Sequence, residues 1–339
     1  MRFPVIGQHN KQINNTNDNN MTQGIIDGQK PIIAIIGSTG HQGGGLARAI
    51  LNDPNSPFQV RAFTRDPSKE ASLTLQEAGA DVVAFDMDGT AQEMATALQG
   101  VYGLFVVTNF WEYMDHNREM AQAKAVVEAG EMTGVQHYIW STLDDTRSFF
   151  DSLPNEERPP KVNGTYVPHF DAKGETNLLF PSSKSTILFT SMYMEDLYMF
   201  GLVKDGVLPL NLDDVQLPVI AAEDIGKSTY SVFRAGEEYK GKSVHLAAER
   251  ISMKHMMQIA TNIVHKEFKY KNVSRTEFAQ ISGSTELANM FDYLRLNLEY
   301  RKALDPSEAH KLNPEIQSVR DFFETHTEEM SALGGASTK

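Results

Sequence analysis

Cysteine is absent from the 339-residue chain, which excludes a disulfide framework, a thiolate metal site and a cysteine nucleophile. No apolar run approaches the roughly 18 residues that a membrane helix needs, so we expect a soluble protein. Basic residues are scarce as well, because 31 Lys and Arg stand against 44 Asp and Glu, a formal net charge of −13. Such a charge gives no general attraction to phosphate backbones, so direct nucleic-acid binding is not expected.

The first 29 residues differ in composition from the rest of the chain. The segment His9–Met21 reads HNKQINNTNDNNM, a polar Asn-rich tract with too little apolar surface to offset its ordering entropy. We therefore predict a disordered tail over 1–29. The length of the remainder fits about two domains, or one large unit with an appended lobe.

From Lys30 onward, buried strands alternate with helical patterns. Ile32–Ile36 is a continuous apolar run, as in a strand that is buried on both faces, and apolar residues then recur at helical spacing up to Leu51. Further strands are predicted at 58–63, 82–85, 102–107 and 137–140, and helices at 70–77, 91–98 and 116–131. This alternation is typical of right-handed βαβ units, so we predict an α/β fold with a Rossmann-type, doubly wound parallel sheet.

The regular pattern ends after Ser141. The segment from Asp144 to Pro168 is rich in proline and charge and is predicted to be a long loop, and a helix with Lys173 and a strand at 186–190 follow it. Residues 191–339 mix short strands, turns and two helical stretches at 253–264 and 285–293. We predict a main domain over 30–190 and, over 191–339, a smaller α+β lobe that partly returns to the main sheet.

A glycine-rich segment directly follows the first predicted strand and opens a helix. It reads Gly37-Ser38-Thr39-Gly40-His41-Gln42-Gly43, a G-x-x-G-x-x-G spacing. One glycine makes the tight turn, another lets the backbone approach a pyrophosphate, and the third allows close packing of helix on strand. The amides and dipole at the helix start favour an anion, so the segment predicts a dinucleotide site.

The end of the second predicted strand indicates which dinucleotide binds. It is followed by Arg65-Asp66-Pro67-Ser68-Lys69, whereas a site for NAD has an acidic residue here for the ribose 2′-hydroxyl. An arginine can hold a 2′-phosphate with two hydrogen bonds, with a hydroxyl and a lysine in support. We therefore favour NADP(H). The alternative is that Arg65 is a solvated cation and Asp66 the ribose ligand.

Two more loops belong to the same predicted edge of the sheet. Asp86 and Met87 follow the third strand, where they can flank an adenine, and Thr108-Asn109-Phe110 follow the fourth, where they can line the pyrophosphate and the nicotinamide ribose. Each signal is weak alone. Their shared position at the carboxyl ends of parallel strands, where ligands bind in open α/β sheets, is the stronger argument.

Together these features resemble the NmrA-like family of the atypical short-chain dehydrogenase/reductase superfamily. The resemblance also rests on 107–112 (VTNFWE), 169–175 (HFDAKGE), 193–196 (YMED) and 287–291 (LANMF), and it covers roughly residues 30–330. It implies an NADP(H)-binding redox sensor that acts through a regulatory protein partner, often with a negative effect on transcription. It also implies a cytoplasmic location, with the nucleus as a second expected location. A homodimer is a further expectation.

The catalytic motif of the superfamily is altered in this chain. Active short-chain reductases carry Tyr-x-x-x-Lys on one helix, where the lysine lowers the pKa of the tyrosine and the phenol donates a proton. Here Lys173 takes the lysine position and His169 the tyrosine position, while Ser141 and Thr142 end the strand that supplies a hydroxyl to the substrate. An ammonium beside the imidazole favours its neutral form, which is a poor proton donor.

We therefore expect a regulator without dehydrogenase activity, in which Thr142, His169 and Lys173 are only candidates for catalysis. In such a regulator, the nicotinamide is expected to be surrounded by Lys173, Tyr193, Met194, Glu195 and Asp196. An enzymatic alternative is an NADPH-dependent reductase of quinone or enone type that uses Lys173, and a third is a pure interaction protein that binds no dinucleotide. No metal is inferred, because the histidines lack ligand spacing. Without cysteine, a redox signal must come from the nucleotide itself.

Overall fold

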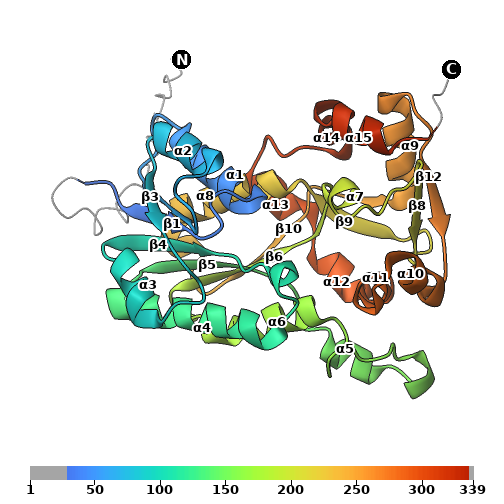
Figure 1. Cartoon of the computed structure of the whole chain (residues 1–339), viewed down its shortest axis with the longest axis horizontal. Helices are drawn as coiled ribbons and strands as arrows, with labels where there is room; N and C mark the ends of the chain where they lie inside the picture. The colour runs from blue at the N-terminus through green and yellow to red at the C-terminus, as the bar shows by residue number, and fades with distance from the viewer. Residues whose placement is uncertain (1–28, 336–339) are drawn as a thin grey trace, which may run out of the picture.

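A seven-stranded parallel sheet forms the centre of the computed structural model, which describes residues 29–335 (Figure 1). Its strand order is β10-β6-β5-β4-β1-β2-β3. The strands are β1 (Ile32–Ile35), β2 (Gln59–Thr64), β3 (Asp81–Ala84), β4 (Val101–Val106), β5 (His137–Thr142), β6 (Ser185–Thr190) and β10 (Ser243–Leu246). This order reverses between β1 and β4, as in a doubly wound sheet, so the predicted Rossmann-type α/β fold is confirmed.

Helices cover both faces of this sheet. One face carries α1 (His41–Leu51) and α8 (Ala222–Ala235), and the other carries α3 (Ala91–Ala97), α4 (His116–Thr133) and α6 (Pro168–Thr176) (Figure 1). The helix α2 (Glu70–Glu77) connects β2 and β3. Helices α1 and α8 pack with their backbones almost in contact, because a Cβ on Gly226 would collide with the backbone of α1.

The predicted elements agree with the structure except in one segment. All five predicted strands up to 140 and the three helices between them are present within one or two residues of the expected limits. The exception is 144–168, which is not a plain loop: it holds the helix α5 (Arg147–Ser152) and a 3₁₀ turn at Asn155–Glu157. The cause is packing, since Phe150 is fully buried and its ring lies 5.0 Å from that of Tyr166.

The C-terminal half adds two small sheets and a group of helices (Figure 1). The three-stranded sheet contains β7 (Met192–Tyr193), β9 (Gln216–Ile220) and β11 (Glu249–Ser252), and the two-stranded one β8 (Val207–Leu210) and β12 (Lys269–Asn272). The helices are α7 (Asp196–Met199), α9 (Met253–Val264), α10 (Arg275–Ser282), α11 (Thr285–Leu296), α12 (Leu298–Ala303), α13 (Pro306–Leu312), α14 (Val319–Thr325) and α15 (Thr327–Leu333).

One hydrophobic core joins the C-terminal half to the main sheet. It includes Leu46 of α1 and Phe233 of α8 as well as Phe291 of α11 and Phe322 of α14, all buried. A second core lies between the sheet and the helices α3 and α4.

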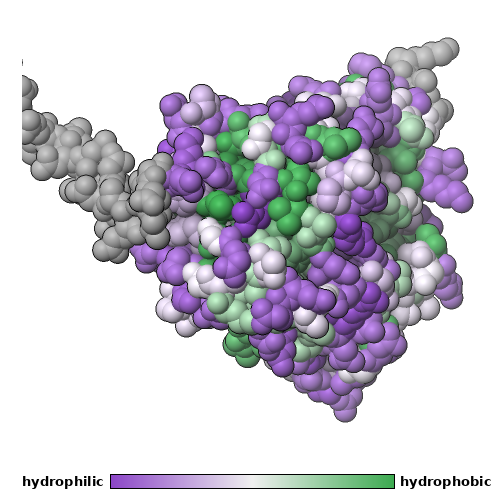
Figure 2. Space-filling view, turned by 60° about the vertical axis from the view of Figure 1, so that its left-hand side comes forward, coloured by the Kyte–Doolittle hydropathy of each residue, from purple (hydrophilic) through white to green (hydrophobic). Residues whose placement is uncertain are grey.

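Figure 2 shows a largely hydrophilic surface on which hydrophobic residues gather near the middle of one face. Of the helices in the described chain, none has the length and apolar character to cross a membrane. The predicted tail 1–29 lies, except for Gln29, outside the described residues.

Candidate functional site

A cavity of about 570 Å³ lies where the carboxyl ends of the parallel strands meet the C-terminal half. Its polar part is lined by the glycine-rich segment and by the loops after β2, β3 and β4. Its apolar part is lined by residues of α6, α7 and α11. One continuous cavity therefore contains the polar edge that the sequence predicts for a dinucleotide and the apolar part, which we call the apolar chamber.

The glycine-rich segment has the backbone geometry of an anion site. Gly37 has a φ of +70°, which favours glycine, and a Cβ on Gly43 would collide with the carbonyl group of Gly37. Helix α1 begins after Gly40, whose position supplies no side-chain cap. The first-turn amides of α1 are thus left to a ligand, and a pyrophosphate matches their charge.

Arg65 lines the cavity at the end of β2, and its guanidinium forms an ion pair with Glu112 of the 3₁₀ turn Phe110–Glu112. This hydrogen bond lowers the pKa of the Glu112 carboxyl. The neighbouring Asp66 carboxylate accepts the backbone N–H of Ser68 at 2.9 Å and its hydroxyl at 2.6 Å. Arg65, Asp66 and the exposed Lys69 all line the cavity, and Asp66 uses only Oδ1 for its bonds to Ser68.

Lys173 is almost buried and its ammonium has three acceptors. It donates to the carbonyl of Thr108 at 3.0 Å, to its hydroxyl at 2.6 Å, and to Glu119 of α4 at 2.8 Å. The Thr108 hydroxyl also contacts the Glu119 carboxylate. These bonds join the loop after β4 to helices α4 and α6, and they leave the ammonium with few free donors.

His169 contacts a carboxylate and not the ammonium of Lys173. Its Nδ1 lies 2.6 Å from Oε1 of Glu286 in the first turn of α11, and its backbone N–H donates to the same oxygen at 2.9 Å. Both side chains are largely buried, with exposed fractions of 6% and 12%. The predicted effect of the Lys173 ammonium on this imidazole stays a prediction, and the ammonium itself bonds to Glu119.

Ser141 and Thr142 end β5 as predicted, but their hydroxyls bond to other side chains. Ser141 donates to Oε1 of Gln42 at 2.7 Å, and Nε2 of Gln42 donates to the Tyr193 hydroxyl at 2.5 Å. Thr142 donates to Oδ1 of Asn177 at 2.7 Å. Burial raises the pKa of the Tyr193 phenol, so Tyr193 is uncharged at neutral pH.

Asp196 lines the cavity at the start of α7. Burial raises the pKa of its carboxyl to about 8, although a hydrogen bond from the Tyr193 backbone acts in the opposite direction. At neutral pH this carboxyl therefore holds its proton and can donate a hydrogen bond.

The apolar chamber is rich in flat and flexible side chains. The Trp111 ring lies 4.7 Å from the His169 imidazole and 5.3 Å from the Phe200 ring. Helix α11 supplies the rest of this wall with Leu287, Met290, Phe291 and Leu294. Such a lining fits a largely apolar, aromatic molecule.

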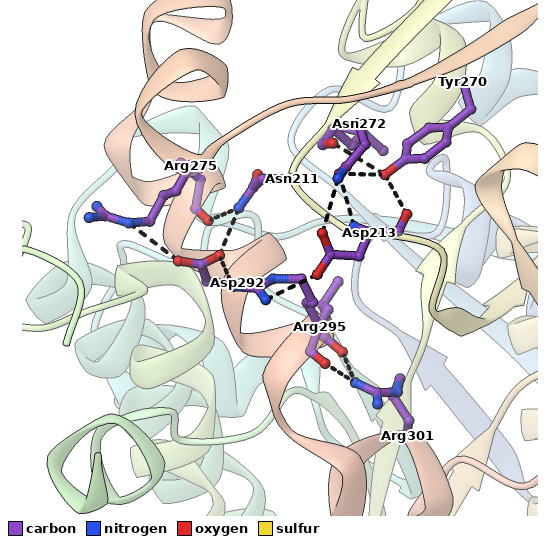
Figure 3. A network of polar contacts seen from close by, with 11 residues as sticks. Asn211, Asp213, Tyr270, Asn272, Arg275, Asp292, Arg295 and Arg301 are labelled. Atoms are coloured by element: carbon purple, nitrogen blue, oxygen red, sulfur yellow. Dashed lines mark hydrogen bonds and ion pairs between the residues drawn. The ribbon is translucent and has the colours of Figure 1, made fainter. Parts of the chain in front are cut away.

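A polar network on the other side of α11 fixes that wall in place (Figure 3). Asp292 accepts from Arg295 at 3.1 Å, from Asn211 at 3.0 Å, and pairs with Arg275 at 3.3 Å. Arg301 donates to the last carbonyls of α11, including that of Leu294 at 2.6 Å. The network joins α11 to α10, α12 and the chain after β8, so the cavity face of α11 has a defined position.

Most predicted site residues line this cavity, but five do not. These are Ser38, Pro67, Ser68, Met194 and Glu195. The Ser38 hydroxyl donates to the Phe63 carbonyl at 2.8 Å, the Met194 side chain is fully buried in the core, and the Glu195 carboxylate accepts the Ala222 backbone N–H at 2.9 Å. For Met194 and Glu195 we correct the prediction of contact with a nicotinamide, because their side chains stabilise the fold.

Sequence reasoning missed the three acidic partners of the site. Glu112, Glu119 and Glu286 contact Arg65, Lys173 and His169 respectively. Glu112 lies in a segment that the family resemblance had marked, but no pattern assigned it a partner. Within residues 29–335, no cluster of three or more His, Cys, Asp or Glu could hold a metal ion.

Comparison with known proteins identifies the family of the chain. The sequence model of the NmrA-like family matches residues 29–323. An NmrA-like family domain-containing oxidoreductase, FrzB of Cladobotryum sp., is 26% identical over 332 residues, which cover 87% of this chain and 98% of FrzB. The crystal structure of NmrA, a negative transcriptional regulator, superposes with a TM-score of 0.68 at 20% identity, covering 87% of this chain and 95% of NmrA.

An NADPH-dependent quinone oxidoreductase from Escherichia coli superposes about equally well. Its TM-score is 0.66 at 21% identity, with 86% of this chain and 98% of that protein covered. NmrA itself has been solved in complex with NAD and with NADP. The family resemblance seen in the sequence is thus confirmed, and the structural neighbours include both a regulator and a reductase.

Proposed function

The chain belongs to the NmrA-like family, and on that premise we propose that it is an NADP(H)-dependent reductase of a flat, largely apolar substrate. The observation that carries this proposal is the continuity of the cavity. A polar edge suited to a dinucleotide opens directly into a chamber lined by aromatic and aliphatic side chains. A regulator that reads only the nucleotide does not need such a chamber.

The residues of the polar edge fit NADP(H). The open first turn of α1 matches the pyrophosphate, and Arg65 with Lys69 matches a 2′-phosphate. The alternative ribose ligand, Asp66, accepts from Ser68 through Oδ1. When bound, the reduced nicotinamide supplies a hydride.

The sequence argument against catalysis weakens with this geometry. It assumed that the Lys173 ammonium disfavours protonation of His169, but Lys173 pairs with Glu119, and a carboxylate contacts the imidazole. Several relatives carry the name NmrA-like family domain-containing oxidoreductase. These names and the quinone oxidoreductase neighbour support a reductase.

Calorimetric titration with NADPH and NADH tests the cofactor, with two variants of opposite expected effect. Arg65→Ala should weaken NADPH binding about 10-fold or more, since a charged hydrogen bond contributes about 1.5–3 kcal/mol, and should leave NADH binding unchanged. Glu112→Gln removes the carboxylate that competes for Arg65, so NADPH should bind up to about 5-fold tighter, the scale of an exposed ion pair. Equal affinities for NADPH and NADH, insensitive to both changes, would contradict the proposal.

Turnover tests the reaction itself. Menadione, a quinone, and benzylideneacetone, an enone, are suitable probes because both are flat and mainly apolar. We expect NADPH consumption with at least one of them. Binding of NADPH without consumption of either probe would contradict the reductase.

A regulatory role is the second candidate function. The observation that favours it is that Thr142 bonds to Asn177 and Lys173 to Glu119, so neither side chain is free for the usual reductase chemistry. The likeness to NmrA, which is described as a negative transcriptional regulator, points in the same direction. A regulator binds NADPH but consumes none with any probe.

A further inference from the structure

We propose that His169 is the proton donor of the reductase and that Glu286 is the residue that positions it. This inference rests on the proposed function and concerns the group that completes the reduction. The familiar donor of short-chain reductases, a tyrosine, is absent from this position. The structure places a histidine with a bonded carboxylate there instead.

The hydrogen bond to Glu286 orients the imidazole. An ionised carboxylate can only accept, so Nδ1 carries a hydrogen and Nε2 is the atom left for chemistry. Within residues 29–335, Nε2 of His169 has no hydrogen-bond partner, and the residue lines the cavity. The rings of Trp111 and Phe170 lie 4.7 and 5.0 Å from the imidazole and pack against it.

The charges around the imidazole support a donor. Within residues 29–335, Glu286 is the charged group bonded to the ring, while Lys173, one turn along α6, bonds to Glu119 and Thr108. A carboxylate at Nδ1 fixes the orientation of the ring and directs Nε2 away from it, as in the His–Asp pair of serine proteases.

Reduction of an enone or a quinone needs one hydride and one proton. As the electrophilic carbon gains the hydride and its electron pair, the π electrons of the conjugated system move onto the carbonyl oxygen. The Nε2–H bond of the imidazolium breaks, and its proton goes to that oxygen. The neutral imidazole then regains a proton from water, while Glu286 stays ionised throughout.

The pair is assembled from the two halves of the chain. His169 lies in the first turn of α6 and Glu286 in the first turn of α11, 117 residues later. The same helix α11 provides the apolar wall of the chamber. Donor orientation and substrate chamber are therefore fixed by one element, which is itself held by the network at Asp292.

Turnover of menadione and benzylideneacetone tests the donor in the full-length protein. His169→Gln should lower the rate about 10²-fold or more, and Glu286→Gln, which keeps the shape but removes the charge, about 10-fold or more. Glu175→Gln is the matched control, because Glu175 pairs with His116 at 3.3 Å and neither residue lines the cavity. NADPH affinity should be retained in all three variants, which shows that they fold.

A second readout does not depend on turnover. In protein labelled with ¹⁵N at histidine, without dinucleotide, the Nδ1–H of His169 should give a far-downfield proton signal that His169→Gln removes. Glu286→Gln should shift this signal upfield, whereas Glu175→Gln should leave it in place. The signal reports the hydrogen bond to Glu286, and turnover of the same variant shows whether that bond acts on the reaction.

Two results would overturn the inference while leaving the proposed function intact. One is full turnover in His169→Gln, with or without loss of turnover in Asp196→Asn, and the other is an Nδ1–H signal of His169 that Glu286→Gln does not shift. Wild-type protein that consumes NADPH with neither probe would overturn the proposed function, and the role of His169 as donor with it.

Discussion

At the scale of single residues, Asp196 is the acid of the cavity whose environment differs most from water. Burial raises the pKa of its carboxyl to about 8, and the neighbouring Glu195, also buried, has a raised pKa as well. In its neutral form such a carboxyl can donate a hydrogen bond, which an ordinary aspartate cannot do. The raised pKa of Asp196 also makes the free energy of unfolding depend on pH.

The expected sign follows from proton linkage. The pKa of Asp196 is higher in the folded chain than its usual 3.8, so between about pH 4 and 8 the folded state binds more protons than the unfolded state. The free energy of unfolding should therefore fall as pH rises through this range, by at most about 1.4 kcal/mol per pH unit from this group. Asp196→Asn should flatten the curve and stabilise the protein above pH 8, as measured by urea unfolding. Parallel curves for the two proteins would contradict the raised pKa.

Residue identities were easier to predict than residue partners. Arg65, His169 and Lys173 follow from local motifs, and all three line the cavity. Their acidic partners lie 47, 117 and 54 residues away along the chain, so no local spacing points to them. The carboxylate that contacts His169 comes from another element, α11, and was not predicted for this reason.

At the scale of elements, α11 has the largest influence on the site. One face carries Leu287, Met290 and Phe291 into the chamber, its first turn bears Glu286, and its other face is fixed through Asp292 (Figure 3). Sequence periodicity predicted a helix at 285–293, because apolar residues recur there at helical spacing. The same periodicity cannot say against which helix or strand the element packs, so its place in the site was not foreseen.

Asp292→Ala should loosen α11 without touching the cavity lining. The change removes bonds from Arg295, Arg275 and Asn211, and it leaves the largely buried Asn211 amide with one acceptor fewer. We expect a loss of about 1–3 kcal/mol in the free energy of unfolding, as for an unsatisfied buried polar group. Turnover should fall as well, while NADPH affinity stays within about 2-fold. Glu299→Ala, which removes an exposed pair with Lys302, is the control and should change neither quantity.

At the scale of the whole molecule, the two halves are joined by a common core. Buried residues of α1 and α8 belong to the same hydrophobic cluster as those of α11 and α14, and β10 of the C-terminal half lies at the edge of the main sheet. The fold class could be predicted because βαβ units have a strong local pattern. The shared core depends on contacts between distant segments, which composition and periodicity do not encode.

This shared core predicts that the described chain unfolds in one transition and that the dinucleotide stabilises both halves together. Far-ultraviolet and near-ultraviolet circular dichroism should give the same midpoint, because secondary structure and packing are lost in one cooperative step. NADPH at about 100 times its dissociation constant should add about 2.7 kcal/mol and shift both midpoints equally. At the same NADPH concentration, Arg65→Ala should show little of this shift in the two midpoints. Within residues 29–335, Arg65 forms no hydrogen bond with the C-terminal half, so an effect on that half must pass through the shared core. Two separate transitions, with only one moved by NADPH, would mean that the halves fold independently and that the cavity between them can open without unfolding.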